Sequence, residues 1–218
     1  MGYHARWGVV PPHFYGKTMS LKAQIHSICE IKAAGFKLVN SKSIPTEDGA
    51  CWEATLAFGS QKLIRAFDGG HGGEMEVDQL ATPKLSPELI RSRLAAFFAL
   101  PATQAMLKKS LIEGEGYSLE FHTITQAEFE VNKAKILADD VGLTNANLEL
   151  AMQSLADSYE TIAHIKRALK TYICFVQQGD DEKGDWRRVK AADTEANREF
   201  IRKRDNVDYF LADLIAGL

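Results

Sequence analysis

The chain has 218 residues, 45% of them hydrophobic and 25% charged, a composition typical of a globular protein that buries a core of its own. Its formal net charge of −3 at pH 7 argues against a general nucleic-acid-binding protein and is too small for a mimic of DNA. Because the three cysteines are scattered without a CxxC pair and no apolar run could span a bilayer, we expect a cytoplasmic protein without a zinc site, disulfides or a membrane segment.

Residues 1–18 differ from the rest of the chain because they show neither a helical nor a strand period. They include two histidines, a tryptophan and two adjacent prolines, and Met19 follows them as a natural second start. Three interpretations stay open: an arm that packs on a partner, a non-native upstream leader, and a tail that lies on its own domain. We expect a single α+β domain over residues 19–218.

Residues 21–80 are predicted to be rich in β-structure. Between Leu21 and Ile31, small or apolar residues alternate with polar ones, which favours a strand, although a helix ending at Gly35 stays open. Turn residues separate three further strand candidates, which cover residues 36–39, 51–58 and 62–67. Together these segments predict an antiparallel meander.

Residues 86–170 are predicted to be mainly helical. Ser86 suits a helix N-cap and Pro87 the first turn, so a helix begins there. Further helices are expected from Pro101 to the glycines near residue 115 and over residues 126–141, with a short strand between them at 117–121. The longest element, residues 144–170, has one apolar stripe, which predicts a core helix. Because this stripe nearly repeats every seven residues, a homodimer seam is the alternative.

The last part of the chain, residues 171–218, is predicted to form a hairpin and a helix. The hairpin strands cover residues 172–176 and 186–189, a helix covers residues 194–203, and an apolar tail follows. The predicted fold class is therefore α+β: a small antiparallel β-meander packed with several helices, one long helix and a late β-hairpin.

A glycine-rich loop follows the third strand of the meander and is the most unusual stretch of the sequence. Glycines allow backbone conformations closed to other residues, and this loop comprises Asp68, Gly69, Gly70, His71, Gly72 and Gly73. His71 is the candidate catalytic residue, as a general base beside Asp68 or Glu74. A metal ligand, a structural turn and a contact loop are the other interpretations.

The same loop could hold an anion through consecutive N–H groups. It lacks the GKS or GKT ending of a P-loop, and no helix opens directly after it, as a dinucleotide-binding fold requires. We therefore expect no cofactor and no metal. Since no complete catalytic set is visible, the sequence favours a binding protein over an enzyme.

Charge is segregated along the chain. Residues 113–160 contain ten acidic residues and two lysines, whereas residues 165–204 contain eleven lysines and arginines and seven acidic residues. Solvated helix faces explain such asymmetry, and a partner-binding surface is the sharper interpretation. The candidate basic patch could contact nucleic acid or an acidic protein face, and it comprises Lys166, Arg167, Lys170, Arg187, Arg188, Lys190, Arg202, Lys203 and Arg204.

Two blocks of the sequence form a recognisable pattern. The first block has an acidic turn (Thr46, Glu47, Asp48), an aromatic-bearing strand at 51–54, and the glycine-histidine loop after Phe67. The second block has residues 170–175, a Gly-Asp turn, Trp186 with Arg187, and a closing helix. Together the two blocks resemble a family of uncharacterised proteins from phages and other mobile elements. This chain has Asp68 and Gly69 where the family usually has Asn-Asp. The resemblance implies an origin and no particular activity.

These observations favour an accessory protein of a phage or mobile element that binds and inhibits a host macromolecule, as anti-defence (anti-CRISPR-like) inhibitors do. The expected partner is a host protein or ribonucleoprotein complex in the host cytoplasm. One alternative is a small hydrolase or phosphate-handling enzyme that uses the Gly-His-Gly-Gly loop. Another is a dimeric structural or regulatory protein built on the long helix.

Overall fold

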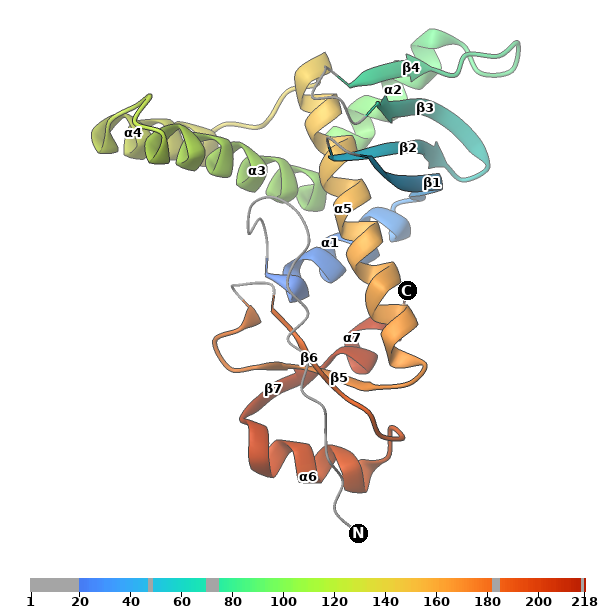
Figure 1. Cartoon of the computed structure of the whole chain (residues 1–218). Helices are drawn as coiled ribbons and strands as arrows, with labels where there is room; N and C mark the ends of the chain where they lie inside the picture. Colours follow the sequence, from blue (N-terminus) through green and yellow to red (C-terminus); the bar gives the residue numbers. More distant parts are fainter. Residues whose placement is uncertain (1–19, 47–48, 70–74, 182–184, 217) are drawn as a thin grey trace. The chain divides into compact units, whose positions relative to one another are not determined.

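A computed structural model describes residues 20–46, 49–69, 75–181, 185–216 and 218. These residues form helices and two antiparallel sheets, which confirms the α+β class (Figure 1). Contacts divide the chain into two compact units: a first unit of residues up to Cys29 together with Ser158–Leu218, and a second unit, Glu30–Asp157. Both divisions fall inside helices, α1 (Leu21–Ala33) and α5 (Asn145–Leu169).

The sheet of the second unit is an antiparallel meander that contains three of the four predicted strands, with β4 in addition to them. Its strands pair in the order β1-β2-β3-β4 and have the bounds β1 (Phe36–Thr46), β2 (Gly49–Phe58), β3 (Gln61–Asp68) and β4 (Glu76–Gln79). Leu56 of β2 lies opposite both Leu38 of β1 and Ile64 of β3, and all three side chains are buried. Alternate positions such as Glu53 and Arg65 point to the other face, so one face of the sheet packs on the core and the other is polar.

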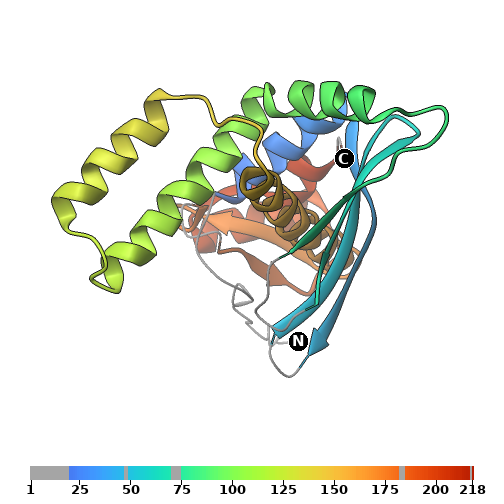
Figure 2. The ribbon, with the colours of Figure 1, turned by 90° about the horizontal axis from the view of Figure 1, so that it is seen from above.

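Helix α2 (Pro87–Phe98) covers the apolar face of this sheet. It begins as predicted, because the Ser86 hydroxyl accepts a hydrogen bond from the N–H of Leu89 at 3.3 Å. Phe97 is buried, and its ring centroid lies 5.3 Å from that of Phe36 at the start of β1. In Figure 2 the helices of the second unit lie to one side of its sheet. The other face is thereby left without a helix of this unit.

The strand predicted from Leu21 is wrong, since these residues form helix α1. The hydroxyl of Ser20 accepts a hydrogen bond from the N–H of Ala23 at 3.2 Å and caps its first turn. Leu21, Ile25 and Ile28 are all buried, at spacings of four and three residues. Burial therefore follows the helical period, and Ile28 is the residue that does not fit a strand.

The strand predicted at 117–121 is also wrong. Helix α3 (Pro101–Glu120) continues through Gly114 and Gly116, and α4 (Gln126–Ala138) follows it as an antiparallel partner. A glycine inside a helix costs about 1 kcal/mol relative to alanine. Contacts with α4 offset that cost; among them, the side-chain amide of Asn132 donates a hydrogen bond to Glu115 at 2.7 Å. Helix α4 ends three residues before its predicted end.

Helix α5 confirms the predicted long helix. Leu148, Met152, Leu155 and Ile162 of its apolar stripe are buried within one chain. This burial agrees with a packing helix, which was the first interpretation of the stripe. No helix in the described part of the chain has the length and apolar character needed to cross a lipid bilayer.

The predicted late hairpin is part of a separate sheet in the first unit. Strand β5 (Ile173–Gln177) lies between β6 (Arg187–Val189) and β7 (Val207–Phe210), and both pairings are antiparallel. Helix α6 (Glu195–Asp205) has Thr194 as its N-cap, and the apolar tail ends in α7 (Leu211–Ile215). The core cluster of this sheet comprises Ile173, Phe175, Ile201 and Phe210.

Candidate functional site

The glycine-histidine loop joins two paired strands. Asp68 ends β3 opposite Trp52 of β2, and Glu76 begins β4 opposite Phe67. Residues 70–74, which include the candidates His71 and Glu74, lie outside the described residues. The catalytic, metal-binding and contact roles considered for this loop therefore stay predictions.

The described residues outside this loop were considered for a metal site and for a reactive thiol. Within them, no group of three or more histidine, cysteine, aspartate or glutamate side chains is placed to hold a metal ion. Cys174 is buried in β5, and this burial raises the pKa of its thiol to about 12. At neutral pH it is therefore a protonated, unreactive thiol, as its apolar surroundings predict.

All nine residues of the candidate basic patch lie in the first unit. Lys166 and Arg167 are in the last turn of α5, and Lys170 follows them. Arg187 and Arg188 are in β6, with Lys190 just after it, and the other three (Arg202, Lys203 and Arg204) are in the last turn of α6. The patch thus draws on three elements of one compact unit.

Four of these nine cations have acidic partners. Arg187 lies 3.4 Å from Asp180, Arg202 2.5 Å from Glu195, Lys203 3.6 Å from Glu199, and Arg204 2.9 Å from Asp205. Each pair lowers the charge that the surface offers to a polyanion. Trp186, which precedes Arg187 in the chain, is buried, with its ring centroid 5.5 Å from that of His164. The patch is therefore a weaker nucleic-acid surface than its sequence suggests.

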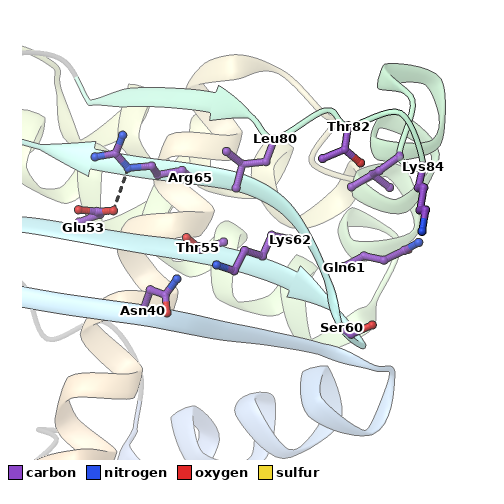
Figure 3. Close-up of a pocket in the computed structure, with 11 residues that line it drawn as sticks. Asn40, Glu53, Thr55, Ser60, Gln61, Lys62, Arg65, Leu80, Thr82 and Lys84 are labelled. Carbon is purple, nitrogen blue, oxygen red and sulfur yellow. Dashed lines mark hydrogen bonds and ion pairs between the residues drawn. The ribbon is translucent and has the colours of Figure 1, made fainter.

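A hollow of about 640 Å³ opens on the polar face of the second-unit sheet. We call it the sheet-face pocket; its lining comprises Asn40, Glu53, Thr55, Ser60, Gln61, Lys62, Arg65, Leu80, Thr82, Lys84 and Leu85 (Figure 3). Arg65 donates a hydrogen bond from Nε to Glu53 at 2.9 Å. That bond, together with the acidic side chains of β4, raises the pKa of Arg65.

Sequence reasoning missed this pocket. The available signal was the alternation in β2 and β3, which places Glu53, Thr55 and Arg65 on the face opposite the core. Alternation alone predicts a solvated face. The pocket also needs the segment after β4, which brings Leu80 and Lys84 to the same place.

A second surface that sequence reasoning missed lies on the α3–α4 hairpin. This hairpin extends away from the sheet of its own unit in both views (Figures 1 and 2). Helix α4 has no buried residue, and Tyr117 on α3 and Phe121 directly after α3 are 42% and 74% exposed. Sequence reasoning placed residues 117–121 in a strand, where alternation also puts Tyr117 and Phe121 on one face but does not place them at the end of a helical hairpin.

Comparisons with protein-family models, with curated proteins and with solved structures found no match to this chain.

Proposed function

We propose that this protein binds and blocks a host protein, and that the outer end of the α3–α4 hairpin is its contact surface. One observation carries the proposal: Tyr117 and Phe121 lie one helical turn apart, exposed, on a hairpin that extends away from its own sheet. Exposed aromatic side chains that lie side by side are the kind of group enriched at the centres of protein interfaces.

The charge around this aromatic pair indicates the chemistry of the partner. Residues 113–131, which we call the hairpin tip, contain five glutamates and no lysine or arginine. An acidic surface with aromatic anchors is complementary to a basic surface that has an apolar pocket. Proteins that handle nucleic acid present basic surfaces of this kind, so we infer that the partner is a nucleic-acid-binding protein or ribonucleoprotein.

A mobile-element origin fits this role, because an accessory protein that covers a host protein's nucleic-acid surface would inhibit it. The resemblance to phage proteins described above motivates this origin. The basic patch of the first unit supplies at most a second contact, since four of its nine cations already have acidic partners.

The test is to capture a partner from a bacterial host and then measure its affinity for variants of the hairpin tip. Phe121→Ala should weaken binding about thirtyfold, as for an interface hot spot worth about 2 kcal/mol. The matched control is Phe200→Ala, because Phe200 is an exposed aromatic residue of the first unit. Both variants should keep the thermal stability of the parent, since the two rings are largely exposed.

Raising the salt concentration should also weaken binding, because the attraction is largely electrostatic. The proposal fails if Phe121→Ala binds as tightly as the parent, or if Phe200→Ala weakens binding to the same extent. It also fails if the complex is insensitive to salt.

A further inference from the structure

The lining of the sheet-face pocket contains more cations than carboxylates. It includes three cations (Lys62, Arg65 and Lys84) and one carboxylate, that of Glu53. Arg65 neutralises Glu53 through the hydrogen bond of 2.9 Å and also interacts with the acidic side chains of β4, so the charges available to a ligand are those of the two lysines. Both lysines are exposed, and neither has an ion pair with another residue in the described ranges. The pocket therefore attracts an anion.

The two lysines lie at opposite ends of the pocket. Figure 3 shows the ammonium group of Lys62 between the side chains of Asn40 and Thr55, and Lys84 beside Gln61 at the other end. An ammonium group, a side-chain amide and a hydroxyl are the donors that commonly surround a phosphate. Leu80 and Leu85 add apolar lining.

Backbone geometry keeps these groups in place. Asn40 has a φ of 55°, and the β1–β2 register shifts between Val39 and Lys42, a bulge that redirects the Asn40 side chain. Thr82 and Leu85 each donate a backbone hydrogen bond of 3.0 Å to the other's carbonyl, so the turn between them presents Lys84. The pocket is thus built from fixed strands and a closed turn, as pre-formed ligand sites are.

We propose that the sheet-face pocket binds a small organic phosphate monoester. Its phosphate group contacts Lys62, Asn40 and Thr55, and its organic body lies along Leu80 and Leu85 toward Lys84. A volume of about 640 Å³ is in the range of sites for ligands of that size. This site is separate from the hairpin tip and does not depend on the proposed partner.

The experiment is an NMR titration of the full chain with phenyl phosphate, with inorganic phosphate and phenol as comparison probes. Phenyl phosphate should bind saturably and shift the amides of Thr55, Lys62 and Thr82. Inorganic phosphate should bind more weakly because it lacks the body, and phenol should bind least because it lacks the charge. These three outcomes separate recognition of the phosphate from recognition of the ring.

Two substitutions in the pocket should have opposite effects. Lys62→Gln should weaken phenyl phosphate binding about tenfold, the loss expected for one charge-assisted hydrogen bond. Glu53→Gln should tighten it about threefold, because it removes the pocket's one carboxylate and releases Arg65. The matched control is Lys135→Gln, an exposed lysine of α4 in the same unit, which should leave the affinity within about twofold of the parent.

Three results would overturn this proposal. The first is that phenyl phosphate fails to saturate the parent chain although its circular dichroism shows a folded protein. The second is that Lys135→Gln weakens binding as much as Lys62→Gln, which would show general charge attraction only. The third is that Glu53→Gln weakens binding, which would mean that the carboxylate helps to hold the ligand and does not repel its phosphate.

Discussion

Helix α6 of the first unit and helix α4 of the second are both short surface helices, yet they are held in different ways. Helix α6 buries Ile201, and its Arg198 donates hydrogen bonds to Asp193 at 2.6 and 2.8 Å and to Asp213 at 2.8 Å. Helix α4 buries nothing and depends on its capping box and on a few side-chain hydrogen bonds, such as that of Asn132. Helix α6 is therefore fixed to the rest of its unit, whereas α4 leaves most of its surface exposed and available for binding.

The Arg198 network also involves an aromatic ring. The Phe210 ring in β7 is buried, and the guanidinium groups of Arg198 and Arg202 lie 4.9 and 5.0 Å from its centroid. Stacked guanidinium groups of this kind add a cation–π attraction to the ion pairs. Helix α6 is therefore joined to the segment before it, to β7 and to α7. Exposed aromatic residues on α3 have no comparable role in the fold.

The largest expected effect comes from removing the centre of this network. Arg198→Ala should lower the free energy of unfolding of the first unit by about 3 kcal/mol, because the Arg198 side chain is only 16% exposed and two carboxylates lose their partner. Hydrogen exchange should show faster opening of α6 and α7, with the α3–α4 hairpin unchanged. Lys203→Ala is the control, since its exposed pair with Glu199 in the same helix contributes little. Equal losses in the two variants would contradict a special role for Arg198.

A smaller effect is expected at the hydrogen bond between Tyr209 and Asp181, also in the first unit. The Tyr209 hydroxyl donates to Asp181 at 2.6 Å, and the same carboxylate oxygen accepts from the N–H of Lys22 at 3.1 Å. Tyr209→Phe should cost about 2 kcal/mol, the usual value for a hydrogen bond to a charged group. Urea denaturation at pH 7 measures this loss.

The pH dependence gives this prediction a second readout. Burial, together with the hydrogen bond to Asp181, raises the pKa of Tyr209 above its ordinary value of 10.0. The folded protein therefore retains a proton that the unfolded chain releases above pH 10, so this contribution is complete below pH 10 and is lost as the pH rises. The Tyr209→Phe variant should lose less stability than the parent between pH 9 and pH 11. Parallel curves for the two proteins would show that the pKa of Tyr209 is not raised in the folded protein.

The sequence predicted those parts of the fold that depend on local periodicity. The first three strands of the meander, the long helix and the late hairpin each have a clear period, and they were predicted correctly. Residues 21–33 were predicted as a strand because their apolar residues fit the strand period as well as the helical one, with Ile28 as the exception to the strand period. The continuation of α3 was missed because glycines such as Gly114 and Gly116 usually end a helix. Contacts with α4 support the continuation of α3 past these glycines, and such contacts between distant residues are not visible in a local sequence pattern.

The candidate sites were harder to predict than the fold for a related reason. The basic patch was located by composition, but the acidic partners of its arginines depend on how α6 folds: Glu195 lies two helical turns from Arg202. The sheet-face pocket combines Asn40, Lys62 and Lys84 from segments that meet only through strand register and a bulge. A slip of one residue would turn these side chains to the other face. Register, and not residue type, therefore determines this site.

The smallest expected effect is a gain in stability, and it tests whether α3 of the α3–α4 hairpin is a continuous helix. Gly114 lies inside α3, and a Cβ added there would meet no atom within 4 Å. Gly114→Ala should therefore stabilise α3 by about 0.5–1 kcal/mol, through helix propensity and a smaller loss of backbone entropy. Slower hydrogen exchange across residues 110–120 would measure this gain. The matched control is Gly59→Ala, which has equally open space but a φ of 58°, so it should destabilise the β2–β3 turn. If Gly114→Ala also destabilised the chain, α3 would not be a continuous helix at Gly114, and Tyr117 and Phe121 would no longer lie at the end of the helical hairpin on which the contact surface depends.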